Sequence, residues 1–82
     1  MYSIYFTEKS RKFLKKLPKK EVQTIVKKVY SIKHNPFPYV KKLQGKKLWR
    51  LRITDYRAVL DIAVTEKKII VLRIGHRKNV YD

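Results

Sequence analysis

The sequence contains no cysteine, which excludes disulfides, zinc–thiolate sites and thiol nucleophiles. It has two histidines, His34 and His76, too few and too scattered to suggest a metal site. Its two glycines do not form a phosphate-binding loop. No apolar run approaches the roughly 20 residues of a membrane span. We therefore expect no metal, no cofactor and no membrane-spanning segment.

Acidic residues are also scarce. Asp and Glu number 6 against 22 Lys and Arg, so the net charge is +16 and the pI is near 10.3. Self-repulsion on this scale destabilises a compact chain, and binding to a polyanion usually offsets it. Nucleic acid is the first partner to consider, before acidic protein segments and anionic membranes. A plainer alternative is that many lysines only solvate the surface.

The length and composition predict a single domain over residues 1–82. An 82-residue chain cannot fill a second core, and a hydrophobic content of 44% is that of a globular protein. The first six residues lack the basic and apolar segments of a secretion signal, so we expect a cytoplasmic protein.

The order of hydrophobic patterns predicts an α+β fold. Residues 2–6 are typical of a strand, and Thr7 is a suitable cap for a helix over the following residues. Two basic amphipathic helices joined at Pro18 are predicted, the second ending near His34. Residues 35–45 are predicted to be a loop. Three strands at 48–53, 56–63 and 69–74 then form a meander, with Arg73 facing Asp61 if the register allows. The helices are expected to pack as an αα-hairpin on one face of a largely antiparallel sheet.

The predicted hairpin at residues 48–57 brings three arginines together. Alternation places Arg50 and Arg52 on one face of the first strand. A two-residue turn at 54–55 would set Arg57 opposite Arg52 on that same face. Three guanidinium groups this close repel one another, which indicates that an anion belongs between them.

The remaining chemistry is limited. No pair of carboxylates suggests glycosidase chemistry, and no Ser-His-Asp or Cys-His group can be assembled. The arginines would suit metal-free cleavage of RNA, in which they stabilise charge on the phosphate while two other groups transfer protons. On these residues alone, simple RNA or DNA binding ranks above catalysis.

The chain resembles the RelE toxins within the broader RelE/ParE superfamily. The resemblance covers nearly the whole chain and rests on five short segments in order: Lys42-Leu43-Gln44-Gly45, Trp49-Arg50-Leu51-Arg52, Asp55-Tyr56-Arg57, Gly75-His76-Arg77 and Val80-Tyr81. It implies a toxin that enters the ribosomal A site and cuts mRNA by attack of a 2′-hydroxyl on the adjacent phosphate, without a metal.

The resemblance also implies roles for individual residues. Arg50 and Arg52 match two basic strand residues, and Arg57 matches a phosphate-clamping arginine. Arg77 matches an arginine that assists the leaving group, and Tyr81 a tyrosine that stacks on the substrate or aids proton transfer. The expected catalytic set is Arg50, Arg52, Arg57, His76, Arg77 and Tyr81, and the expected RNA contacts are Trp49, Lys46, Lys47 and Lys78.

One departure from the family leaves the general base open. Arg50 and Arg52 stand where the best-known member has lysines, and a guanidinium with a pKa of about 12.5 or more is a poor base. His76 is the better physical candidate, because histidine titrates near neutrality. Tyr81 and Arg52 are the alternatives.

The resemblance implies partners and two competing functions. The partners would be a small, acidic, RelB-like antitoxin that folds on binding, the ribosome and mRNA. Operator DNA would be contacted only through the antitoxin. The competing functions are a ParE-like toxin that acts on DNA gyrase by protein contact, and a nucleic-acid-binding module without activity.

Overall fold

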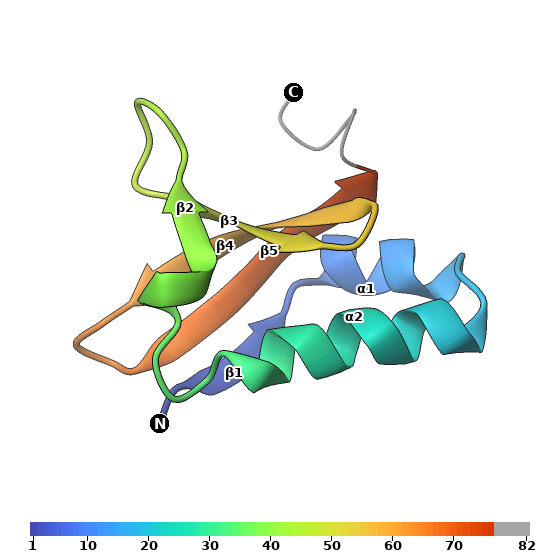
Figure 1. Ribbon diagram of the computed structural model, residues 1–82, viewed down its shortest axis with the longest axis horizontal. Helices are drawn as coiled ribbons and strands as arrows, with labels where there is room; N and C mark the ends of the chain where they lie inside the picture. The colour runs from blue at the N-terminus through green and yellow to red at the C-terminus, as the bar shows by residue number, and fades with distance from the viewer. Residues whose placement is uncertain (77–82) are drawn as a thin grey trace.

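The computed structural model describes residues 1–76 and has an α+β architecture, as predicted (Figure 1). Two helices lie side by side on one face of a five-stranded sheet. The elements in chain order are β1 (Ser3–Phe6), α1 (Glu8–Lys15), α2 (Lys19–Ser31), the 3₁₀ helix η1 (Phe37–Tyr39), β2 (Val40–Lys42), β3 (Trp49–Ile53), β4 (Tyr56–Ala63) and β5 (Lys68–His76).

The sheet has the strand order β1-β5-β4-β3-β2. β1 pairs with β5 in parallel, and the other three pairings are antiparallel. The predicted meander is therefore confirmed, and β1 joins it along β5.

One predicted loop was wrong. Residues 35–45 contain η1 and the edge strand β2, in which Val40 pairs with Leu51 and Lys41 with Arg50. A three-residue strand with two lysines is too short to show an alternating pattern, so its pairing with β3 decides the structure.

The two helices begin and end for identifiable reasons. Thr7 caps α1 as predicted, since its hydroxyl accepts a hydrogen bond from the Ser10 amide at 3.2 Å. Pro18 lies between the two helices, as predicted, and is the residue immediately before α2. The second helix stops at Ser31, short of the predicted end near His34. The Tyr2 amide donates to the Lys33 carbonyl at 2.8 Å, which ties the chain beyond α2 to the N-terminal strand.

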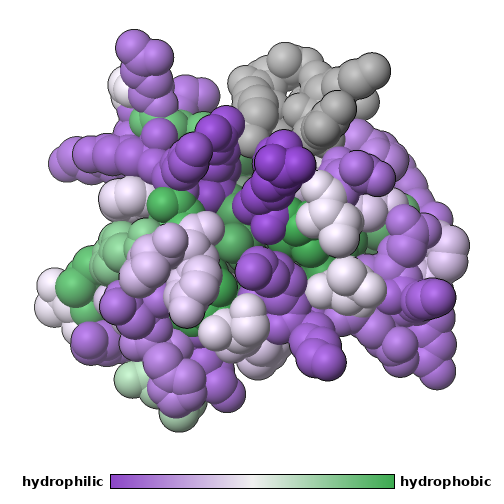
Figure 2. All heavy atoms as spheres, viewed as in Figure 1, coloured by the Kyte–Doolittle hydropathy of each residue, from purple (hydrophilic) through white to green (hydrophobic). Residues whose placement is uncertain are grey.

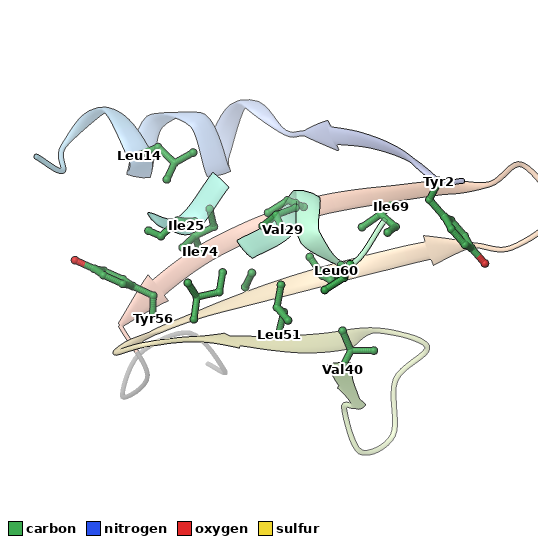
Figure 3. Close-up of a cluster of buried hydrophobic side chains, with 14 residues drawn as sticks. Tyr2, Leu14, Ile25, Val29, Val40, Leu51, Tyr56, Leu60, Ile69 and Ile74 are labelled. Atoms are coloured by element: carbon green, nitrogen blue, oxygen red, sulfur yellow. The ribbon is translucent and has the colours of Figure 1, made fainter. Parts of the chain in front are cut away.

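The core lies between the helices and the sheet (Figure 3). Ile25 and Val29 of α2 are completely buried, and they face a sheet surface that includes Leu60 and Ile69. The predicted packing of both apolar helix stripes on one face of the sheet is therefore confirmed. No helix within residues 1–76 is long and apolar enough to cross a membrane.

A β-bulge interrupts the pairing of β4 with β5. Val59 pairs with Arg73 and Leu60 with Val71, so Leu72 is an extra residue without a partner in β4. Asp61 lies opposite Ile70, and no ion pair joins it to Arg73 in the described part of the chain. The predicted pairing of Arg73 with Asp61 was therefore wrong.

Candidate functional site

The turn between β3 and β4 sets the geometry of the site. Its register pairs Ile53 with Tyr56 and Arg52 with Arg57, which confirms the predicted two-residue loop. Thr54 has a φ of 53°, a left-handed conformation that is unusual for a β-branched residue. The tight turn holds the two strands together and fixes the Arg52–Arg57 pair across them.

Four cations converge on the face of the sheet opposite the helices. Arg50, Arg52 and Arg57 line a pocket of about 140 Å³ together with Lys41 and Tyr39. We call the three arginines and Lys41 the cation cluster. It consists of two directly opposed pairs, Lys41 with Arg50 and Arg52 with Arg57. Like charges in opposed positions destabilise a sheet, so the pocket is suited to an anion.

The sequence analysis missed two of the five described residues that line this pocket. Lys41 and Tyr39 lie in a stretch that was predicted to be a loop, and neither was assigned to the site. A pairing signal was available, since Val40 precedes a Gly45-containing turn and could have been aligned with Leu51. That alignment places Lys41 beside Arg50.

The side chain of Arg57 is held close to the turn. Its Nη1 donates to the carbonyl of Tyr56 at 3.0 Å and lies 3.5 Å from the carbonyl of Thr54. These contacts are local, and they restrict the guanidinium at the rim of the pocket. A restricted guanidinium loses less entropy when it binds a phosphate.

His76 lies on the other face of the sheet. It pairs with Tyr56, and the two rings lie 4.8 Å apart between centroids. The Tyr56 ring contacts Phe13 of α1, and its hydroxyl donates to the Glu21 carboxylate of α2 at 2.5 Å. Tyr56 thus points to the helices, and opposed residues share a face, so His76 is on the helix side. It is not brought together with Arg57.

The β-bulge explains this placement. If Leu72 paired with Val59 and the pairing continued without a bulge, His76 would lie on the face that carries Arg57. The extra residue shifts the register by one position, so each later residue of β5 lies on the opposite face from the one that unbulged pairing would give it. Arg73 consequently lies on the open face, opposite Val59.

The hydrogen bond from Tyr56 to Glu21 affects ionisation. It raises the pKa of the Tyr56 phenol above its usual value of 10.0, with smaller contributions from burial and from the negative charges of Glu21 and Asp55. Tyr56 is therefore a neutral donor at ordinary pH, and it joins β4 to α2 behind the cation cluster.

The predicted RNA contacts are dispersed. Trp49 is half-buried on the helix side of the sheet, where its ring meets Phe37 edge-on at 5.2 Å. Lys46 and Lys47 are in the loop between β2 and β3, which projects from the sheet at the upper left of Figure 1. Hydrophilic side chains cover much of the visible surface, including this projecting part (Figure 2). None of these three residues lines the pocket.

Three predicted site residues, Arg77, Lys78 and Tyr81, lie outside the described residues. Within residues 1–76, no group of three or more His, Asp or Glu side chains could hold a metal ion. Among these described residues, no carboxylate or imidazole lines the pocket. The described part of the site can therefore bind a phosphate and stabilise charge that develops on it, and proton transfer requires other groups.

The chain matches one protein family over residues 4–81. That family is described as the ParE toxin of the type II toxin–antitoxin system parDE. A search of curated proteins finds no significant match.

Solved structures of toxin–antitoxin complexes have the same fold. The RelBE2 complex of Mycobacterium tuberculosis aligns with a TM-score of 0.85 and 25% identity, over 93% of this chain and 98% of the other. The archaeal RelE–RelB complex of Pyrococcus horikoshii aligns with a TM-score of 0.81 and 26% identity, over 96% and 98%. A YoeB/ParE toxin from Agrobacterium tumefaciens, at 20% identity and a TM-score of 0.73 over 94% and 99%, shares the fold.

Proposed function

The chain belongs to the ParE toxin family of type II toxin–antitoxin systems, within the RelE/ParE superfamily, and we propose that it is a ribosome-dependent, metal-independent mRNA endonuclease. The observation that carries this proposal is the cation cluster on the open face of the sheet. A phosphodiester gains negative charge as it is attacked, and fixed guanidinium groups stabilise that charge. The similarity to RelE chains at 25% and 26% identity supports the same assignment.

The reaction would be an internal transfer within the RNA strand. The 2′-oxygen of a ribose attacks the adjacent phosphorus, and the bond to the 5′-oxygen of the next nucleotide breaks. Arg50, Arg52 and Arg57 would bind the phosphate oxygens as their charge increases. A base removes the 2′-proton and an acid protonates the 5′-oxygen.

The proton-transfer roles are proposed for Arg77 and Tyr81. His76 is not chosen for these roles, since its imidazole packs against the Tyr56 ring on the helix side of the sheet. A guanidinium binds anions well but is a poor base at neutral pH. Tyr81, as its phenolate, would accept the 2′-proton, and the Arg77 guanidinium would donate a proton to the departing 5′-oxygen.

The proposed partners are a cognate antitoxin, the ribosome and mRNA. Several similar toxins were solved in complexes with RelB antitoxins. We propose that a small, acidic antitoxin neutralises this chain, whose charge of +16 favours an acidic partner. Contact with operator DNA would occur through the antitoxin.

Primer extension on mRNA in a translation extract tests the endonuclease function. Wild-type protein should produce codon-dependent cuts, and Arg57→Ala should reduce them about 100-fold or more, since it removes a donor to the transition state. Lys27→Ala, which removes an exposed cation from α2, should cut like wild type. Intact mRNA with wild-type protein would overturn the proposal.

A second candidate function is gyrase-directed toxicity by protein contact, as in the ParE branch. The observation that favours it is the family match itself, which is to ParE toxins. Gyrase-linked DNA breaks with intact mRNA would support this function. RNA binding with neither outcome would indicate a nucleic-acid-binding module without activity.

A further inference from the structure

An exposed aromatic ring borders the cation cluster. Tyr39 lines the same pocket as Arg50, Arg52 and Arg57, and the residue is 56% exposed. Large aromatic side chains normally bury most of their surface, so a ring left open beside four cations is unusual. Core packing does not explain it, because Tyr39 is not part of the core cluster.

The backbone presents this ring from a restrained segment. Tyr39 is the last residue of η1, and its amide donates to the Pro36 carbonyl at 3.0 Å. Pro36 is fully buried, and Pro38 restricts the dihedral angle φ next to the tyrosine. The ring thus extends from a short helix that is fixed to the core, and its position varies less than it would on an open loop.

Two lysines lie close to the ring, one from the cation cluster and one from α2. Lys41 follows it in β2 and lines the pocket, and the Nζ atom of Lys28 in α2 lies 5.7 Å from the ring centroid. Phosphate-binding cations next to an exposed aromatic ring are the pattern by which proteins hold single-stranded nucleic acid, with the backbone on the charges and a base on the ring. An acidic protein segment would require only the charges.

We propose that Tyr39 stacks on a nucleobase of single-stranded RNA beside the phosphate bound by the arginines, and that Lys41 is a fourth phosphate-binding cation. This inference rests on the RNA-directed function proposed above and identifies a base-binding subsite for it. The subsite selects an unpaired base, because a base within a duplex has no free face for the ring.

Binding of a 2′-O-methyl oligoribonucleotide at near-physiological salt tests the subsite. This probe lacks the attacking 2′-hydroxyl, so it binds without being cut, and single abasic residues can be introduced at each position in turn. Tyr39→Leu should weaken binding of the intact probe about 5- to 100-fold, the range for loss of one stacked base. Tyr39→Phe should bind like wild type, since it keeps the ring.

The abasic probes separate stacking from a general loss of fold or charge. At one abasic position, wild type and Tyr39→Leu should bind equally weakly, because the base that stacks is already missing. Lys41→Gln should lower the slope of log affinity against log salt by about 0.7, which corresponds to one phosphate contact on a single strand.

Tyr5 provides a matched control at the opposite edge of the sheet. The residue is 48% exposed, and the Nζ of Lys68 lies 5.7 Å from its ring centroid, the same distance as that from the Nζ of Lys28 to the Tyr39 ring. Tyr5→Leu should retain wild-type affinity. An equal loss in Tyr5→Leu and Tyr39→Leu would overturn the proposal, as would a Tyr39→Leu defect that persists on every abasic probe. Tyr39-dependent binding of polyglutamate of equal affinity would assign the site to an acidic protein instead.

Measuring mRNA cleavage by the same proteins in the translation extract distinguishes failure of the subsite from failure of the endonuclease function. If wild type binds the probe through Tyr39 but leaves mRNA intact, the endonuclease function fails and the subsite stands. If wild type cuts mRNA and Tyr39→Leu binds the probe normally, the subsite alone is refuted.

Discussion

The two faces of the sheet have opposite properties, although they are built from alternate residues of the same strands. On the helix side, Leu51 and Leu60 are buried under α1 and α2. On the open side, the neighbouring Arg50 and Arg52 are part of the cation cluster. The first face supplies burial, which stabilises the fold, and the second concentrates like charge, which opposes it. The comparison indicates that stability and ligand binding are divided between the faces, so substitutions on each should have different consequences.

Truncation of the helix-side core should have the largest effect on stability. Leu60 is fully buried, so Leu60→Ala should reduce the free energy of unfolding by about 2–5 kcal/mol through lost burial and a residual cavity. Urea denaturation measures the change. Val64→Ala, at a residue that is 52% exposed in the turn after β4, should change it by less than about 0.5 kcal/mol. Equal costs at the two sites would mean that the core is not organised as described.

The tyrosine behind the cation cluster should give the fold a dependence on high pH. Folding raises the pKa of Tyr56, chiefly through the hydrogen bond to Glu21, so the folded state retains the phenolic proton after the unfolded state has lost it. The stabilisation is complete below about pH 10, the unfolded pKa, and decreases as the pH rises toward the folded pKa. Wild type should therefore be more stable than Tyr56→Phe at pH 8, with a smaller advantage at pH 11.

Urea denaturation of both proteins across that range measures this difference. Subtracting the free energy of unfolding of Tyr56→Phe from that of wild type removes the effect of lysine titration, which the two proteins share. Tyr30→Phe, at a tyrosine that is 43% exposed, is the control and should match wild type throughout. A constant difference between wild type and Tyr56→Phe from pH 8 to pH 11 would contradict the assigned hydrogen bond.

A residue better suited to the left-handed conformation at position 54 should stabilise the fold. Thr54 occupies the left-handed region at φ 53°, where asparagine is more favourable than a β-branched side chain. Thr54→Asn should stabilise the fold by about 0.5–1 kcal/mol without moving the Arg52–Arg57 pair. Thermal unfolding measures the gain. Thr65→Asn, in the turn after β4 and without a positive φ, should give none.

Local patterns in the sequence were sufficient for most of the fold and for the centre of the site. Alternation around a two-residue turn is a short-range signal, so it correctly paired Arg52 with Arg57. Helical periodicity likewise identified the buried stripe that contains Ile25 and Val29.

Features that depend on pairing between strands were not predictable in this way. β2 is too short to show an alternating pattern, so neither Lys41 within it nor Tyr39 just before it was assigned to the site. The bulge at Leu72 changes which face His76 occupies, and nothing in the local sequence marks it, because Leu72 continues an apolar run. Residue type alone had made His76 the favoured base, and only the register shows that it is separated from the arginines.

The smallest change in the free energy of unfolding should come from relieving repulsion on the open face. Whether that change is a gain or a loss is the sharpest test of the difference between the two faces. Arg52 and Arg57 are directly opposed, so Arg52→Gln should raise the free energy of unfolding by about 0.2–1 kcal/mol while it weakens RNA binding. Lys27→Gln removes an exposed cation that has no charged residue three or four positions away on its helix, so it controls for the lower net charge. Because surface repulsion is screened by ions, the gain of Arg52→Gln over Lys27→Gln should shrink in 1 M salt. A destabilised Arg52→Gln would mean that the cation cluster contributes to folding, and the division of roles between the two faces would not hold.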